Sequence, residues 1–137
     1  MDAEHLKKLR MIADALATHA QHALRDARLA ERGLRDELTE MSHLRTQAQS
    51  WTEQAHLGLD ARWTEYLDQR RIILNAELAQ NLAMQDPLAR TAAQAVGRLS
   101  AFADLETEAR HTETTIRRKK SELDLMELAV HKKRKSS

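Results

Sequence analysis

The side chains that first suggest chemistry are seven histidines set among many acidic residues. Three Glu-x-x-His pairs occur in the chain: Glu40–His43, Glu53–His56 and Glu108–His111. In di-iron helical bundles, two such pairs and two further glutamates bind the metals when all these side chains converge on one core. The helical periodicity described below instead places the three pairs at solvent-facing or edge positions. We therefore expect no metal site in this chain.

Motifs for nucleophilic catalysis or phosphate binding are also missing from the sequence. It has no Gly-x-Ser-x-Gly motif, no glycine-rich phosphate loop and no cysteine. A pair of helices also offers little concave surface from which to exclude water during a reaction. We therefore predict that the protein is not an enzyme, that no residue is catalytic and that it binds no cofactor.

A basic C-terminal region is the strongest charge feature. Residues 117–137 contain eight basic and three acidic residues, although the net charge of the whole chain is only +1. Such a region can complement the negative end of a helix dipole and aid solubility, or it can dock onto an acidic protein surface. Binding to nucleic acid or to an anionic membrane is a third interpretation, but no stacking aromatic residues accompany these charges.

Two of the four aromatic residues, Trp63 and Tyr66, lie three positions apart in the stretch "DARWTEYLDQRRIIL". One interpretation is that they cap the tip of a helical hairpin by packing against Leu57 and Leu59. The other is that they are exposed anchors for a partner, since Trp, Tyr and Arg are enriched in binding hot spots. The third aromatic residue, Trp51, is expected to pack inside the seam between two helices.

The elements that must position these residues are long helices. Only three glycines and one proline occur, 31% of residues are charged and 3% are aromatic, which is typical of coiled coil. Apolar residues recur at heptad spacing over the first half of the chain, which indicates a helix–helix seam. The first row of this heptad pattern is Leu6, Ala13, Ala20, Ala27, Leu34, Met41, Ala48 and Ala55. The second row is Leu9, Leu16, Ala23, Ala30, Glu37, Leu44, Trp51 and Gly58.

The predicted fold is therefore all-α, a single antiparallel two-helix coiled-coil hairpin over residues 1–137. Asp2 is a plausible N-cap, Gly58 can end the first helix, and Asp60 can cap the second. We expect the first arm over about residues 3–57, the turn over about 58–61 and the second arm over about 62–133. Two i,i+4 ion pairs, Glu4–Lys8 and Glu31–Arg35, are expected on the first arm.

The second arm is less regular. Its apolar seam runs from Leu67 to Phe102, slips in register up to Ala109 and then resumes. The resumed seam is Ala109, Thr112, Ile116, Lys119, Leu123, Met126 and Val130. Pro87, after a possible cap at Asp86, predicts a kink or a brief interruption of the helix. The alternative is a full turn at Pro87, which would pair residues 5–50 with 87–132.

The sequence shows no membrane-spanning or secretory segment. Its longest stretch without Lys, Arg, Asp or Glu is Ala15–Leu24, and ten residues are far fewer than the roughly 18 that a spanning helix needs. The N-terminal stretch "MDAEHLKKLR" lacks the apolar core of a secretory signal. These features predict a soluble, cytoplasmic protein.

The segment "RWTEYLDQRRIIL" resembles the Arg-Trp-x-x-Tyr segment that opens the second long helix of the flagellar export protein FliJ and its relatives. Chain length, a long first helix, a turn before the motif and the basic helix "RRKKSELDLMELA" also match that family's layout. The resemblance implies a coiled coil similar to the γ stalk of rotary ATP synthases. The paired termini of this protein would insert into a hexameric export ATPase of the type III (flagellar) protein export apparatus and stimulate ATP hydrolysis.

The resemblance also implies further partners: the cytosolic domain of the export gate, and export chaperones that the protein escorts. The gate-binding face would follow Trp63 and Tyr66 and comprise Gln69, Ile73, Ala76 and Gln80. The family often has an aromatic residue at the position of Gln69 and a more polar residue at that of Gln80. Such a protein would lie in the cytoplasm, peripheral to the inner membrane at the export apparatus.

The basic C-terminal residues are the candidates for binding the ATPase, because they can engage acidic loops around its pore. They are Arg117, Arg118, Lys119, Lys120, Lys132, Lys133, Arg134 and Lys135. The main alternative is a generic coiled-coil scaffold or tether, either a monomer or a dimer, without an ATPase partner. We expect no nucleic-acid partner, and a nucleic-acid or membrane binder would show a steep dependence of binding on salt.

Overall fold

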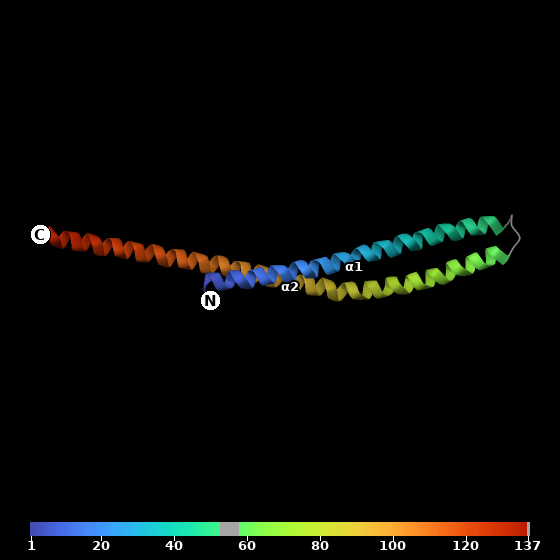
Figure 1. Cartoon of the computed structure of the whole chain (residues 1–137), viewed down its shortest axis with the longest axis horizontal. Coiled ribbons are helices and arrows are strands. Elements are labelled where there is room, and N and C mark those ends of the chain that lie inside the picture. Colours follow the sequence, from blue (N-terminus) through green and yellow to red (C-terminus); the bar gives the residue numbers. More distant parts are fainter. Residues whose placement is uncertain (53–57, 137) are drawn as a thin grey trace. The chain divides into compact units, whose positions relative to one another are not determined.

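The computed structural model describes the backbone of residues 1–52 and 58–136 and the side chains of residues 1–50 and 61–136. Two helices account for nearly all of these residues: α1 at Ala3–Thr52 and α2 at Gly58–Lys135 (Figure 1). The described residues contain no strand. The predicted all-α fold, with two helices packed against each other as a hairpin, is confirmed.

The start of α1 is fixed by its cap. The Asp2 side chain accepts a hydrogen bond from the backbone N–H of His5 at 2.8 Å, and the Asp2 carbonyl accepts one from Leu6 at 3.1 Å. The predicted N-cap is therefore confirmed, and it satisfies an amide that has no partner inside the helix. At the other end, α2 finishes with Lys132, Lys133, Arg134 and Lys135, whose positive charges complement the helix dipole.

The contacts divide the chain into two compact units, which are described separately. Unit 1 comprises Met1–Ala17 and Gln94–Ser137, and unit 2 comprises Thr18–Ala93. In unit 1, Ala3 contacts Glu113 and Arg10 contacts Glu106, so the residue number falls on α2 as it rises on α1. The same holds in unit 2, where Glu31 contacts Gln85 and Glu37 contacts Arg70. The helices are therefore antiparallel within each unit.

The seam on α1 has the predicted first row but a different second row. Leu6, Ala13, Ala20 and Ala48 of the first row are buried. Of the predicted second row, Leu9, Ala23 and Leu44 are half-buried, whereas Leu16, Ala30 and Glu37 are exposed. The residues one position later are all buried or half-buried: Arg10, Ala17, Leu24, Glu31, Leu38 and Arg45. Leu16 of the predicted row is 57% exposed. The sequence pattern disfavoured the actual row because three of its members are charged, and those three find partners on α2.

The predicted register slip on α2 is wrong. In unit 1, partly or fully buried residues follow at regular intervals of three and four: Leu99, Phe102, Glu106, Ala109 and Glu113. The pattern stays in step because Glu106 occupies a seam position at only 6% exposure. A carboxylate can lie there since Arg10 and Arg110 both donate to it, at 2.5 and 2.7 Å.

The turn predicted at residues 58–61 is also wrong, because those residues begin α2. Glycine is tolerated at the start of a helix as well as after its end, so Gly58 marks the beginning of the second helix. The last part of the predicted first arm, residues 53–57, lies outside the described residues.

Pro87 neither interrupts α2 nor reverses the chain, and a kink there is not confirmed. Proline removes the hydrogen bond that its backbone nitrogen would donate to residue Ala83. Both Ala83 and Pro87 lie on the exposed face of α2, where water can satisfy the Ala83 carbonyl. The half-buried seam residues Gln85 and Leu88 continue on either side, so packing against α1 holds the helix through this position.

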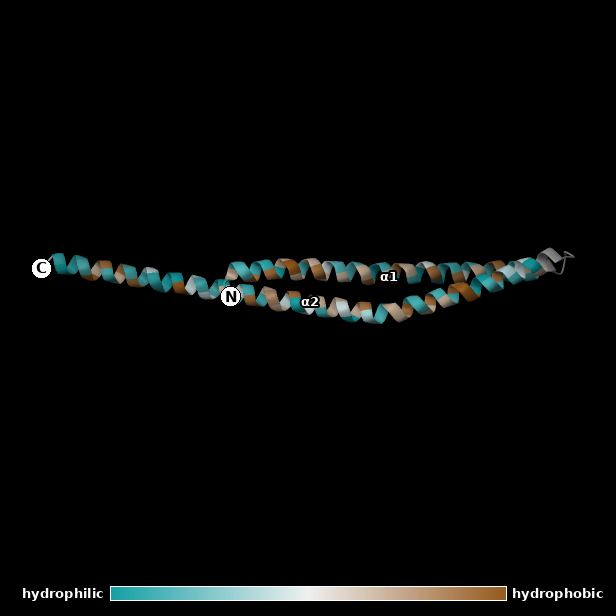
Figure 2. Cartoon of the chain, turned by 60° about the horizontal axis from the view of Figure 1, so that its bottom comes forward, coloured by the Kyte–Doolittle hydropathy of each residue, from teal (hydrophilic) through white to brown (hydrophobic). Residues whose placement is uncertain are grey.

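Apolar residues recur between polar ones along both helices, as the hydropathy colouring shows (Figure 2). Neither helix, over the residues described, contains a stretch long and apolar enough to cross a membrane.

Candidate functional site

Two exposed surfaces of α2 contain the residues singled out by the sequence. The first, here called the aromatic face, lies in unit 2 and comprises Trp63, Tyr66, Gln69, Ile73, Ala76 and Gln80. The second, here called the C-terminal segment, is residues 116–135 in unit 1. The structure thus places the two predicted groups of site residues on separate surfaces.

The aromatic face points away from the seam because the neighbouring residues Leu67 and Leu74 face α1. Leu67 and Leu74 are 2% and 0% exposed and anchor α2 against α1. All six residues of the aromatic face are exposed. Four of them recur at intervals of four, three and four, so they share one side of the helix. The candidate gate-binding residues are therefore both accessible and contiguous.

Trp63 and Tyr66 stack on each other. Their ring centroids lie 5.6 Å apart, with an angle of 20° between the ring planes. As whole residues, Trp63 and Tyr66 remain 38% and 54% exposed. An offset stack of this kind orients both rings before any partner arrives, which lowers the entropic cost of binding. The exposure fits the partner-anchor interpretation, whereas the proposed packing against Leu57 and Leu59 lies outside the described side chains.

Arginines near the stack are used within the protein. Arg70 donates to Glu37 on α1 at 3.2 Å. Arg45 on α1 forms an ion pair with Asp68 on α2. These pairs connect α2 to α1 next to the aromatic face, so the part of α2 that carries the two rings is held in place.

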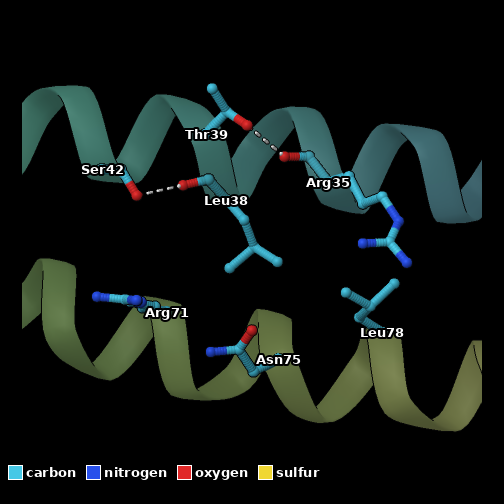
Figure 3. A pocket seen from close by; sticks show the side chains of 7 residues that line it. All are labelled: Arg35, Leu38, Thr39, Ser42, Arg71, Asn75 and Leu78. Carbon is cyan, nitrogen blue, oxygen red and sulfur yellow. Dashed lines mark hydrogen bonds between the residues drawn. The ribbon is translucent and has the colours of Figure 1, made fainter.

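A shallow groove of about 450 Å³ lies between the helices in unit 2 (Figure 3). Leu38 points from α1 toward α2, and Arg71, Asn75 and Leu78 line the α2 side. The hydroxyls of Thr39 and Ser42 donate to carbonyls of their own helix, at 3.0 and 3.1 Å. None of the lining residues forms a nucleophile–base pair, and the groove offers a polar contact surface.

Within the part of the chain that the structure describes, no helix covers the C-terminal segment. Ala3, the first residue of α1, donates from its backbone N–H to Glu113 at 3.1 Å. α2 continues beyond this point, and every residue from Ile116 to Lys135 is exposed. All eight predicted ATPase-binding residues are exposed on it.

Sequence reasoning missed that the apolar residues of this segment are exposed. Ile116, Leu123 and Val130 were expected in the seam but are 60%, 59% and 53% exposed. The signal was available, because an arm running to residue 133 is longer than the first arm can cover. Unequal arm lengths in a hairpin leave the end of the longer arm unpaired.

Glu31, a charged residue in the seam of unit 2, has a pKa that is shifted by its neighbours. Arg35 donates to its carboxylate at 2.7 Å, which confirms the predicted i,i+4 pair, and Gln85 donates at 2.7 Å from α2. These two hydrogen bonds, that from Arg35 first, lower the pKa of Glu31 below its usual value.

The histidine motifs are not assembled into a site in the part of the chain that is described. Glu40, His43, Glu108 and His111 are all exposed. Among the described residues, no group of three or more His, Asp or Glu side chains is arranged to hold a metal ion. The pair Glu53–His56 lies outside the described residues.

Comparison with models of protein families, with curated proteins and with solved structures gave no match.

Proposed function

We propose that this protein is a FliJ-type stalk of a type III export apparatus, such as that of the bacterial flagellum. It inserts into a hexameric export ATPase, stimulates ATP hydrolysis and links the ATPase to the export gate. The observation that carries the proposal is the exposed basic segment of α2 beyond the start of α1. The sequence resemblance to that family supplies the identity of the partners.

The C-terminal segment is the part that enters the ATPase. A single helix is narrow enough to occupy a pore, and its exposed cations attract acidic loops around that pore. These cations sit in two groups, residues 117–120 and 132–135, separated by three turns of helix. Contacts at two depths would let the helix engage more than one ring of loops.

The aromatic face is the part that binds the cytosolic domain of the export gate. Its stacked Trp63 and Tyr66 provide the kind of rigid aromatic area that concentrates binding energy. Ile73 extends the apolar surface and is 49% exposed. Gln69 and Gln80 add polar contacts at the edges, where hydrogen bonds to a partner fix orientation.

The protein acts by assembly in this proposal. It performs no reaction of its own, binds no cofactor, and escorts export chaperones in the cytoplasm, peripheral to the membrane-bound apparatus. A stiff helix pair suits this role because it can transmit contact from one partner to another.

ATP hydrolysis by the cognate export ATPase, measured across a titration of this protein, tests the proposal. We expect cooperative stimulation that saturates well below one protein per ATPase subunit, as a single stalk in a hexameric ring requires. No stimulation, with helix content verified by circular dichroism, would favour the tether instead.

Charge reversal localises the contact. Replacing Arg117, Arg118, Lys119 and Lys120 by Glu should abolish most of the stimulation at moderate salt. The matched control reverses four exposed cations of α1, Lys8, Arg25, Arg28 and Arg32, which changes the net charge equally. Equal loss in both variants would mean that only total charge matters.

Gate binding has its own matched pair of variants. Ile73→Asp should weaken binding to the gate domain by about tenfold or more, since it places a charge at the centre of the aromatic face. Ile72→Asp is the control, because Ile72 is 68% exposed but lies about 100° around the helix. Equal affinity of both variants for the gate domain, measured by calorimetry, would rule out this face.

A further inference from the structure

The seam of the hairpin continues in phase onto the uncovered C-terminal segment. In unit 1, one row of seam residues on α2 holds Phe102 and Ala109, and the other holds Glu106 and Glu113. Continued at seven-residue steps, the first row becomes Ile116, Leu123 and Val130, and the second becomes Lys120 and Glu127. All five of these are exposed. The segment therefore presents a complete heptad face that α1 is too short to cover.

The charges in this face specify what covers it. Apolar residues occupy the first row throughout, while the second row has a cation at Lys120 and an anion at Glu127. A parallel second copy would set Lys120 against Lys120 and Glu127 against Glu127, and like charges across a seam repel. An antiparallel second copy sets each Lys120 against Glu127 of the other, so that both charges are paired.

The apolar row is satisfied by the same antiparallel arrangement. When Leu123 of one copy faces Leu123 of the other, Ile116 faces Val130. Unit 1 has the same antiparallel direction of pairing, since Arg10 meets Glu106 and Ala3 meets Glu113 across α1 and α2. In this dimer Glu113 of one copy would face residue 133 of the other, but Ala3 of α1 already contacts Glu113. The contact between the copies therefore ends near Val130.

We propose that the C-terminal segment binds a second copy of this chain, forming an antiparallel dimer about Leu123 with reciprocal Lys120–Glu127 pairs. This inference does not depend on the proposed export ATPase, since it follows from the seam alone. The dimer covers Lys120, so within the proposed function it would compete with insertion into the ATPase.

Sedimentation equilibrium of the full chain over a range of concentrations tests the dimer. We expect the average mass to rise from that of a monomer toward twice that value as concentration increases. A seam of two heptads is short, so the dimer should form only at high protein concentration. A chain that stays monomeric throughout the range overturns the proposal and leaves the segment for a different protein.

Charge exchange identifies the contact. Lys120→Glu and Glu127→Lys should each weaken dimerisation by about tenfold, because each creates two like-charge contacts per dimer. The double variant restores opposite charges and should recover the original affinity. Arg118→Glu is the control, because it makes the same charge change on the side of the helix opposite the seam. Failure of the double variant to recover, or equal weakening by Arg118→Glu, overturns the proposal.

Orientation is measured by attaching spin labels to single cysteines in a chain that has none of its own. Labels at Ser121 lie near the symmetry axis and should be close together in the dimer. Labels at Ser136 should be roughly 40 Å apart, given the rise of 1.5 Å per helical residue. A parallel dimer would give short distances at both positions and would overturn the antiparallel arrangement.

Discussion

The two units place different polar groups in the same kind of seam. Unit 1 buries the carboxylate of Glu106 between Arg10 and Arg110. Unit 2 uses neutral amides: Asn81 donates to the Ala27 carbonyl at 3.0 Å, and Gln85 donates to Asn81 at 2.7 Å. Unit 2 thus has a pair of neutral amides in its seam in addition to the ion pairs Arg45–Asp68 and Arg70–Glu37, whereas the buried polar group of unit 1 is a carboxylate bound by two arginines.

This difference means that the two units should respond differently to the same kind of substitution. Removing one partner of a buried ion pair leaves a charge without compensation, which is costly. Replacing both partners of a buried hydrogen bond between amides by apolar residues of similar size can be nearly neutral or stabilising. The comparison can therefore be tested by substitutions that have opposite expected signs.

The largest effect is expected in unit 1 for Glu106→Ala. This change removes the acceptor of both Arg10 and Arg110 and leaves a gap in the seam. We expect a loss of about 2 kcal/mol in the free energy of unfolding, below the full value for a buried pair because both arginines are partly exposed. Urea denaturation followed by circular dichroism measures the loss.

Glu108→Ala is the control for this prediction. Glu108 lies two residues away on the same helix and is exposed, so the same chemical change should alter stability by only a few tenths of a kcal/mol. Hydrogen exchange should localise the effect of Glu106→Ala to the amides of unit 1. Equal destabilisation by the two variants would contradict the role given to the buried carboxylate.

Glu106 also marks where sequence reasoning reached its limit. The helical fold followed from the scarcity of glycine and proline and from the heptads, and the first row of α1 was predicted at the correct residues. The second row was displaced because a single helix does not reveal which of two neighbouring rows faces its partner. Arg10, Glu31 and Arg45 look unfit for a seam until their partners on α2 are known.

The candidate surfaces were predictable to different extents. The exposure of Trp63 and Tyr66 was one of two open interpretations, since whether an aromatic residue is buried depends on the tertiary structure around it. The stack between their rings was not foreseen, although a spacing of three residues permits it. The basic residues of the C-terminal segment were identified by charge alone, because long cationic side chains rarely lie in a core.

A smaller effect of opposite sign is expected in unit 2 for the double variant Asn81→Leu with Gln85→Leu. This variant removes both partners of the Gln85–Asn81 hydrogen bond, and Glu31 keeps its bond to Arg35. We expect a gain of about 1 kcal/mol in the free energy of unfolding, because apolar residues replace both amides in the seam. Urea denaturation measures the gain.

The same double variant should reduce the specificity of pairing. Polar residues in a seam fix register at some expense of stability, so replacing Asn81 and Gln85 by Leu removes a constraint on how the helices align. Broader hydrogen-exchange distributions for the amides of unit 2 would show this loss. Destabilisation comparable to that of Glu106→Ala would mean that the amide network is as essential as the charge pair, and the contrast between the units would fail.

The smallest effect is a pH dependence within unit 2 that comes from Glu31. Hydrogen bonds from Arg35 and Gln85 lower the pKa of this carboxyl in the folded state relative to the unfolded chain. A group with a lowered pKa adds stability above its unfolded pKa, and that stability is lost as the pH falls through the folded value.

Unfolding midpoints measured below pH 5 should therefore decline less steeply for Glu31→Gln, which cannot titrate, than for the parent chain. Glu65→Gln makes the same chemical change at an exposed position of the same unit and is the control. If both variants give the slope of the parent chain, Glu31 does not contribute to the acid sensitivity, and the response of unit 2 to pH must come from its other carboxylates.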